Sequence, residues 1–206
     1  AGSLRIAVIA DTHDRLAPSL LEALREADEI WHLGDVCEKG TLKTILDLGP
    51  QVSVVRGNQD NQPEWPISLE LERFGHRFHL VHIPPGHAPS GTEFLLHGHT
   101  HVPRDQKVEG TRFLNPGPAG LANKGAPRSF AWLELAERKE PVFRLAAVRD
   151  RRHDPPDKGD AILPKSGLNQ ISDWFSDLFG ELPKRTEKIH IVSGQEGKSA
   201  YLSKLG

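Results

Sequence analysis

Cysteine and methionine are nearly absent from this sequence, which has one cysteine, Cys37, and no methionine among 206 residues. A single cysteine excludes a disulfide framework and any zinc module that is built from several cysteine ligands. Long apolar runs are also missing, since stretches such as residues 6–10 are far too short to cross a bilayer. The first residues do not resemble a signal peptide. We therefore expect a cytoplasmic protein that does not associate with a membrane.

The sequence has no excess of basic charge. Its 26 lysines and arginines are balanced by 28 aspartates and glutamates, for a net charge of −2. Proteins that bind long nucleic acids need a basic face that neutralises phosphates. The balance therefore argues against long DNA or RNA as a partner. With 37% apolar and 26% charged residues, the chain has the composition of a globular protein with one core and an appendage.

Alternating strands and helices are predicted for the first third of the chain. Apolar residues 4–10 predict a buried strand, and residues 17–28 predict a helix. Pro18 lies in the first turn of this helix, where its missing N–H does no harm. A strand, a helix and a strand follow over residues 29–33, 41–48 and 51–55. This order favours parallel pairing with right-handed crossovers.

Hairpins dominate the prediction for the next part of the chain. Three strand pairs are expected, over residues 68–71 and 77–82, 105–108 and 111–115, and 129–135 and 142–148. A short strand over residues 93–96 lies between the first two pairs. We therefore expect an α/β fold in which two mixed sheets pack face to face between outer helices, a four-layer α/β/β/α sandwich.

The composition changes after the last predicted strand. We expect one domain over residues 4–148 and a charged, proline-containing linker over residues 149–165. Residues 166–206 are expected to form a C-terminal extension with one amphipathic helix, whose apolar residues include Trp174, Phe175, Leu178 and Phe179. This helix either packs on the preceding domain, covers the rim of its site, or docks a partner subunit.

Side chains that bind metals follow the predicted strands where each strand ends. The candidates are Asp11, His13, Asp35, Asn58, His82, His99 and His101. Polar groups at the carboxyl ends of strands in an α/β sheet converge on one crevice. This mixture of oxygen and imidazole donors suits two divalent ions of the middle of the transition series, Mn, Fe, Zn or Ni. Asp35 could bridge such a pair.

Most of these motifs are weak when each is taken alone, and Gly98-His99-Thr100-His101 is the strongest of them. Asp11-x-His13 is common without a metal, and Gly34-Asp35 and Gly57-Asn58 are also ordinary turn sequences. Their combination, in which each follows an apolar strand, indicates a two-metal site. Two ions about 3.5 Å apart can hold a shared hydroxide and clamp both oxygens of an in-line phosphoryl displacement.

The order of motifs resembles the calcineurin-like metallophosphoesterase superfamily, and within it the small YfcE-type phosphodiesterases, over residues 4–148. The resemblance implies one ion bound by Asp11, His13, Asp35 and His101, and a second bound by Asp35, Asn58, His82 and His99. It also implies that Asn58 contacts the substrate phosphate and that manganese is preferred, with nickel, zinc, iron or magnesium as alternatives. A hydroxide that bridges the ions would attack phosphorus in a diester with a good leaving group.

Three departures from this family matter for the site. Gln59 stands where many members have a histidine that assists the leaving group, and glutamine cannot act as an acid. His13 or a metal-bound water is then the hypothesised proton donor. Residues 83–97 are too few for the helix that the family has here, which leaves His82 or His87 as the ligand, with His82 favoured at its strand end. Asn115-Pro116-Gly117-Pro118 replaces the family's Asn-Pro-Gly-Ser, for which we expect a structural role.

The function that we expect is metal-dependent hydrolysis of a phosphodiester, with Asn58 and His13 as catalytic residues. The alternatives are a non-catalytic, metal-binding scaffold for protein interaction with the same fold, a nuclease that acts on short ends, and a phosphomonoesterase. The expected partner is a small phosphodiester substrate. Assembly into a homo-oligomer and docking of a partner by the extension are both compatible with the sequence.

Overall fold

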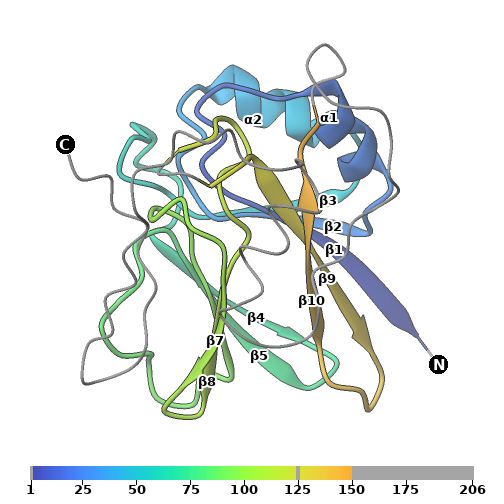
Figure 1. Ribbon diagram of the computed structural model, residues 1–206, viewed down its shortest axis with the longest axis vertical. Helices are drawn as coiled ribbons and strands as arrows, with labels where there is room; N and C mark the ends of the chain where they lie inside the picture. Colours follow the sequence, from blue (N-terminus) through green and yellow to red (C-terminus); the bar gives the residue numbers. More distant parts are fainter. Residues whose placement is uncertain (1, 124–125, 150–206) are drawn as a thin grey trace, which may run out of the picture.

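The computed structural model describes residues 2–123 and 126–149, which form two packed β-sheets and two helices (Figure 1). The first sheet has the strand order β10-β9-β1-β2-β3. Its strands are β1 (Ser3–Ile9), β2 (Glu29–His32), β3 (Gln51–Val54), β9 (Ser129–Ala136) and β10 (Val142–Ala147). The second sheet, in the order β4-β5-β6-β8-β7, contains β4 (Ser68–Arg73), β5 (His76–Val81), β6 (Phe94–Leu96), β7 (Arg104–Val108) and β8 (Thr111–Asn115). The helices are α1 (Pro18–Arg25) and α2 (Lys39–Leu46).

Parallel pairing joins the first three strands of the chain. β1 pairs with β2, which aligns Val8 with Trp31, and β2 pairs with β3, which aligns Trp31 with Ser53. The helices α1 and α2 make the two crossovers, as parallel strands require. All three strands therefore end at the same edge of the sheet. β9 and β10 complete the sheet as antiparallel strands on the far side of β1.

The second sheet consists of two antiparallel pairs around a short central strand. β4 pairs with β5, and β7 pairs with β8. β6 lies between the two pairs and runs parallel to both β5 and β8. Because β5 and β6 run in the same direction, the residues that follow them leave the sheet at the same end. These are the segments that carry His82, His99 and His101.

Side chains of β1 alternate between two apolar cores. Ile6 and Val8 belong to the core between the two sheets. Ala7 and Ile9 belong to a second core that lies under the helices. The helices contribute Leu20, Leu24 and Ile45 to this second core. β1 is therefore covered on both faces, which explains its continuous apolar sequence.

The expected pair of mixed sheets is confirmed, and the strands lie close to their predicted positions. Both described helices cover the first sheet (Figure 1). No helix covers the second sheet within residues 2–123 and 126–149, so the described part of the chain shows three of the four expected layers. The segment between β5 and β6 has no helix, as its short length predicts. The predicted linker and C-terminal extension lie outside the described residues, apart from residue 149.

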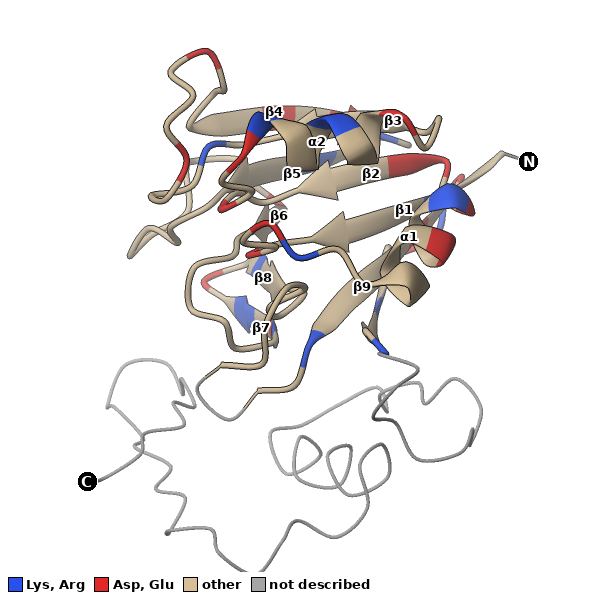
Figure 2. Cartoon of the chain, turned by 90° about the horizontal axis from the view of Figure 1, so that it is seen from above, with Lys and Arg blue, Asp and Glu red and all other residues tan. Residues whose placement is uncertain are grey.

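Charges of both signs are interspersed over the described elements (Figure 2). Exposed ion pairs join Lys43 to Asp47 and Lys39 to Glu64, each at 2.7 Å. α1 and α2 are short and amphipathic, so neither of these two described helices could cross a membrane.

Candidate metal centre

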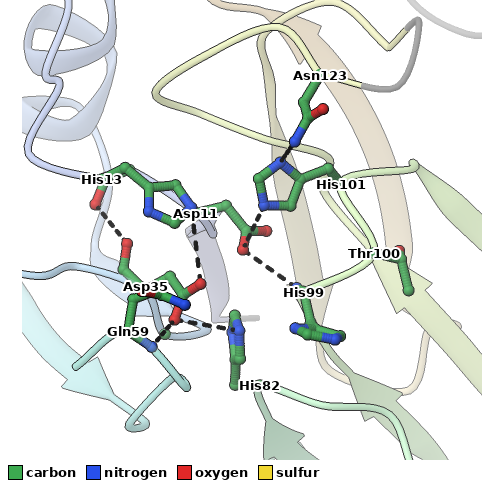
Figure 3. A network of polar contacts seen from close by, with 12 residues as sticks. Asp11, His13, Asp35, Gln59, His82, His99, Thr100, His101 and Asn123 are labelled. Atoms are coloured by element: carbon green, nitrogen blue, oxygen red, sulfur yellow. Dashed lines mark hydrogen bonds and ion pairs between the residues drawn. The ribbon is translucent and has the colours of Figure 1, made fainter.

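All seven candidate ligands lie at one end of the sheet pair. Figure 3 shows six of them, and Asn58 joins them through contacts with His82 and His99. Asp11 and His13 follow β1, Asp35 follows β2 and Asn58 follows β3. His82 comes directly after β5, and His99 and His101 follow β6. The two sheets thus bring together five short segments that are far apart in the sequence.

Backbone hydrogen bonds hold these segments against one another. The N–H of Asp11 donates to the carbonyl of Gly34, and the N–H of His13 donates to the carbonyl of Asp35, each at 3.0 Å. At the end of the second sheet, the N–H of Gly98 donates to the carbonyl of His82 at 3.1 Å. Because the bonds join main-chain atoms, the positions of the candidate side chains depend little on their own contacts.

Five of the candidate ligands have left-handed backbone conformations. Their φ angles are 53° for Asp11, 43° for His13, 55° for Asp35, 64° for His99 and 57° for His101. Such angles cost non-glycine residues roughly 1–2 kcal/mol each. Strain of this kind persists where the surrounding structure over-determines it, and it clusters at functional sites. Here it coincides with the residues that the sequence predicts to be ligands.

The Asp35 carboxylate lies between two histidines. Its Oδ2 is 3.7 Å from His13 Nε2, and its Oδ1 is 3.3 Å from His82 Nε2. The carboxylate is almost completely buried. One oxygen toward each histidine is the arrangement that a bridging ligand needs.

The Asp11 carboxylate has an unusual hydrogen-bonding pattern. Its Oδ1 accepts the backbone N–H of His99 at 3.2 Å and lies 3.2 Å from His101 Nε2. Its Oδ2 is buried and has no hydrogen-bond partner within the described residues. A buried carboxylate oxygen without a partner is costly unless a cation neutralises it. This oxygen therefore fits a metal ligand.

Asn58 links the histidines at the other side of the site. Its Oδ1 lies 2.9 Å from His82 Nε2 and 2.8 Å from His99 Nδ1. The rings of His82 and His99 are 5.2 Å apart, and those of His13 and His101 are 5.4 Å apart. The site therefore consists of two histidine pairs, with the carboxylates of Asp11 and Asp35 beside them.

Ligand atoms gather in two overlapping groups. Asp11, His13 and His101 form one group, and Asp11, Asp35 and His82 form the other, with all ligand atoms of a group within 4.8 Å of one another. Asp11 belongs to both, whereas the sequence assigned the shared position to Asp35. Both carboxylates therefore have a position from which they could serve two ions.

Charge interactions shift the pKa values of Asp35 and His82 in opposite directions. Burial by itself would raise the pKa of Asp35, but hydrogen bonds from His82 and from the N–H of Gln59 lower it below the ordinary value. Burial would lower the pKa of His82, but its hydrogen bond to Asp35 and the nearby charge of Asp11 raise it. The carboxylate is therefore stabilised in the ionised form, which is the form that binds a cation.

His82 has the surroundings of a metal ligand, and His87 does not. The Nδ1–H of His82 donates to the carbonyl of Leu33 at 2.8 Å, which directs Nε2 into the site. Metal-binding histidines commonly use the second ring nitrogen in this way. The His87 side chain is 85% exposed and lies 3.5 Å from Glu109. The geometry therefore favours His82.

Asp60 supports the site, although the sequence reasoning assigned it no role. Its Oδ2 accepts the N–H of Asp35 at 3.0 Å and the N–H of Gly57 at 2.7 Å, and its Oδ1 accepts the N–H of Cys37 at 2.7 Å. One buried carboxylate thus joins the segment after β2 to the segment after β3. The signal was present, because aspartate in a turn often accepts backbone N–H groups.

His32 and Thr12 form a second support that the sequence did not reveal. His32 Nδ1 accepts the N–H of Gly34 at 3.2 Å, and His32 Nε2 lies 3.0 Å from Thr12 Oγ1. Burial lowers the pKa of His32 to about 4, although the charge of Asp60 opposes this shift. His32 is therefore neutral near pH 7 and positions the two turns on either side of it.

The loop that begins at Asn115 has the structural role that we expected. The Asn115 amide donates to the carbonyl of Gly98 at 3.1 Å and to Thr100 Oγ1 at 3.0 Å. Its oxygen accepts the N–H of Gly117 at 2.8 Å. Asn115 thus fixes the turn that carries His99. Asn123, which the sequence did not single out, lies 3.0 Å from Nδ1 of His101.

Gly57 allows the segments after β2 and β3 to approach each other closely. A Cβ at this position would overlap with the Oδ1 and the backbone nitrogen of Asp35. No other residue type could therefore stand beside Asp35 without displacing it. Cys37 also lies close by, with Sγ 3.6 Å from His13 Nδ1, and burial raises its pKa to about 11. A protonated thiol is a poor metal ligand.

Comparisons with known proteins agree with this geometry. A probable metallophosphoesterase of Methanothermobacter thermautotrophicus is 33% identical over 130 residues, which make up 54% of this chain and 75% of the relative. The phosphodiesterase YfcE of Escherichia coli K12 is 24% identical over 181 residues, or 72% of this chain and 94% of that protein. Vacuolar Protein Sorting 29 of Cryptosporidium parvum has a TM-score of 0.64 at 21% identity, and covers 79% of this chain and 96% of that one. This last likeness shows a common fold.

A family model covers most of the described chain. The model of the calcineurin-like phosphoesterase superfamily domain matches residues 4–138, which include all seven candidate ligands. The resemblance seen in the sequence is thereby confirmed, and the chain belongs to the calcineurin-like phosphoesterase superfamily.

Proposed function

We propose that this protein is a metal-dependent phosphodiesterase with two divalent ions at the candidate centre. The observation that carries the proposal is the pair of buried carboxylates beside two histidine pairs, in which Asp11 Oδ2 has no partner within the described residues. A site made only of uncharged ligands would have no buried negative charge for a cation to neutralise. The names of the relatives support phosphoester hydrolysis.

Two sets of residues would hold the ions. Asp11, His13, Asp35 and His101 form the first set, and Asp35, Asn58, His82 and His99 form the second. Carboxylate oxygens and imidazoles together suit manganese, with nickel, zinc, iron and magnesium as alternatives. Bound there, two divalent ions would supply a hydroxide nucleophile at neutral pH and neutralise the charge that develops on the phosphoryl oxygens.

Asn58 is placed to orient the phosphate of the substrate. Its Oδ1 is engaged by His82 and His99, and its side chain is exposed. The Nδ2 group has no hydrogen bond among the described residues, so it is available to donate one to a phosphate oxygen. Such a bond stabilises negative charge on that oxygen as the reaction proceeds.

The residue after Asn58 limits the choice of substrate. Gln59 uses its backbone N–H to hold Asp35 Oδ1 at 2.9 Å, and its side chain has no proton to give as an acid. The proton for the leaving group then comes from His13 or from water. We therefore propose small phosphodiesters with good leaving groups as substrates, and a cytoplasmic location for the reaction.

Metal removal and restoration test the proposal. The protein is treated with EDTA, and hydrolysis of bis-p-nitrophenyl phosphate and p-nitrophenyl phosphate is measured before and after Mn, Ni, Zn or Mg is added. We expect manganese to restore cleavage of the diester above that of the monoester. Asp35→Asn should abolish both activity and metal loading. The matched control is His87→Ala, because His87 is exposed and lies against Glu109.

Two results would contradict the proposal in different ways. A protein shown to carry two metals but without turnover on either substrate would overturn the enzyme and favour an interaction scaffold of the same fold. Faster cleavage of the monoester than of the diester would mean that the protein is a phosphomonoesterase and not a phosphodiesterase. The source of the proton for the leaving group is tested with His13→Ala. If this variant keeps both metals but loses turnover, the result supports His13 as the proton donor. Unchanged turnover excludes His13 from this role.

A further inference from the structure

A pocket of about 420 Å³ opens beside the candidate metal centre. Asn58 and His82 form part of its wall, so the pocket and the centre share two residues. Most of the remaining wall is apolar and comes from Ile67, Val81, Ile83, Pro85 and Pro89. Pockets of this size, with apolar walls and a few polar groups, are typical of small-molecule sites.

Two of the wall residues are large apolar side chains that are exposed in the described part of the chain. Ile67 is 68% exposed and Ile83 is 54% exposed. They flank the two paired ends of the β4–β5 hairpin, directly before β4 and just after β5, and they line the same pocket. An isolated exposed isoleucine is unremarkable, but two that line one pocket beside a polar centre form an apolar surface suited to a ligand.

The segment after His82 gives the pocket a stiff wall. Ile83 is followed by Pro84 and Pro85, in the region that is too short for a helix. Proline fixes its own φ and restricts the residue before it. The wall is therefore largely formed before any ligand binds, which lowers the entropy cost of binding.

Arg56 adds a cation to the pocket. Its backbone N–H donates to the carbonyl of Pro66 at 2.7 Å, which anchors the residue next to Gly57 and Asn58. Among residues 2–123 and 126–149, its guanidinium has no hydrogen bond or ion pair. A free guanidinium can stack on a flat ring or pair with a phosphate oxygen.

We propose that this pocket binds an apolar ester group of the substrate, of the size of an aromatic ring or larger, while the centre holds the phosphate. The inference rests on the proposed function, and it narrows the substrate to phosphodiesters with at least one aryl-sized ester group. Continuity with Asn58 and His82 carries the assignment, because an ester group must lie within one bond of the phosphate. Ile67 and Ile83 are then specificity-determining residues.

Two substrates with the same leaving group test the assignment. Phenyl p-nitrophenyl phosphate and methyl p-nitrophenyl phosphate both release p-nitrophenolate, so only the second ester group differs. We expect the manganese-loaded protein to favour the phenyl substrate by about tenfold or more in kcat/KM, since burying a ring is worth about that factor. In Ile83→Asp and Ile67→Asp this ratio should fall at least about fivefold. Comparing ratios between proteins cancels the intrinsic reactivities of the two esters.

The matched control is Leu46→Asp, because Leu46 is an aliphatic residue of α2 with a similar exposure of 51% and does not line the pocket. Its ratio should equal that of the original protein. If both pocket variants also keep that ratio, the pocket assignment is wrong while the proposed function stands. If no protein cleaves either ester, the proposed function fails. In that case, calorimetry with phenylphosphonate and methylphosphonate tests the pocket assignment. If the pocket binds an apolar group, the protein binds phenylphosphonate more tightly than methylphosphonate, and Ile83→Asp removes this difference in affinity.

Discussion

At the scale of single residues, the candidate centre depends on side chains that are not themselves ligands. Asp60 accepts three backbone N–H groups, and two of them belong to Asp35 and Gly57. His32 fixes the turn at Gly34 from the other side. These contacts hold the main chain of the ligand residues in conformations that would otherwise be unfavourable.

Asp60→Asn should weaken both the fold and the site. An amide in place of the carboxylate loses at least one charge-assisted acceptor, and hydrogen bonds to charged groups contribute about 1.5–3 kcal/mol each. We expect the free energy of unfolding to fall by about 2 kcal/mol and kcat to fall at least tenfold. Urea unfolding and diesterase assays measure the two effects. Asp28→Asn is the control, because Asp28 also accepts a backbone N–H, from Arg5 at 2.7 Å, but lies away from the centre. Equal effects of the two variants on kcat would contradict a positioning role for Asp60.

His32 should make the stability of the metal-free protein depend on pH. Its folded pKa, lowered to about 4 by burial, is below the unfolded value of 6.5. Between these pH values the unfolded chain binds more protons, so the free energy of unfolding falls as the pH decreases from 6.5 to 4. The loss due to this residue should reach about 3 kcal/mol. His32→Gln does not titrate and should lack this part of the decline.

The measurement is urea unfolding in EDTA at several pH values from 4 to 7. The variant also loses buried contacts, so the informative quantity is the change with pH and not the stability at one pH. His87→Gln, at an exposed histidine, should keep the slope of the original protein. Parallel curves for the original protein and His32→Gln would show that His32 does not resist protonation.

The sequence named the candidate ligands residue by residue, and the structure places them together, but most of the contacts that support them could not be predicted. Asp11, Asp35 and the histidines follow apolar strands in a characteristic order, and sequence shows order directly. The sharing of Asp11 between both ligand groups depends on side-chain distances that no spacing reveals. The positive φ angles arise from tertiary contacts, since nothing local in Asp11-Thr12-His13 requires them.

At the scale of helices and strands, periodicity predicted most of the architecture. Every described strand was expected within a few residues of its observed bounds. α2 begins at Lys39, whereas the sequence predicted a start at residue 41. The start was missed because its N-cap residue, Glu38, makes no side-chain capping bond of the kind that marks a helix start in a sequence. The sequence did not predict that β6 lies between the two antiparallel pairs in the sheet. A strand of three residues is too short for its sequence to indicate which strands it pairs with.

β1 contributes side chains to both apolar cores, because its second half is buried on both faces. Ile9→Ala should lower the free energy of unfolding by about 2–5 kcal/mol, since it removes buried methyl groups and leaves a cavity. Ile67→Ala, at an isoleucine that is 68% exposed, should change it by less than about 0.5 kcal/mol. Urea unfolding of both variants measures the difference. Similar values would contradict the placement of Ile9 in the core beneath the helices.

At the scale of the whole molecule, the two sheets meet so that neither alone contains the centre. The first sheet supplies Asp11, His13, Asp35 and Asn58, and the second supplies the other histidines. Each of the two proposed ions would bind residues from both sheets, so it would join the sheets and neutralise the buried carboxylates. Metal binding should therefore stabilise the entire fold and not only the loops.

Thermal unfolding should show this coupling. A ligand that binds only the folded state at one hundred times its Kd adds about 2.7 kcal/mol of stability per site. For a chain of this size the shift in Tm should be about 5–10 °C when manganese is restored after EDTA. Asp35→Asn removes a ligand between the two sheets, so its Tm should respond little to manganese. Its metal-free Tm should be lower than that of the original protein, because the variant loses the charge that His82 and the N–H of Gln59 stabilise. An unchanged shift in Tm with manganese in Asp35→Asn would show that the ions bind elsewhere. A shift that is lost in Asp35→Asn but kept in the control His87→Ala would show that metal binding at the centre stabilises both sheets.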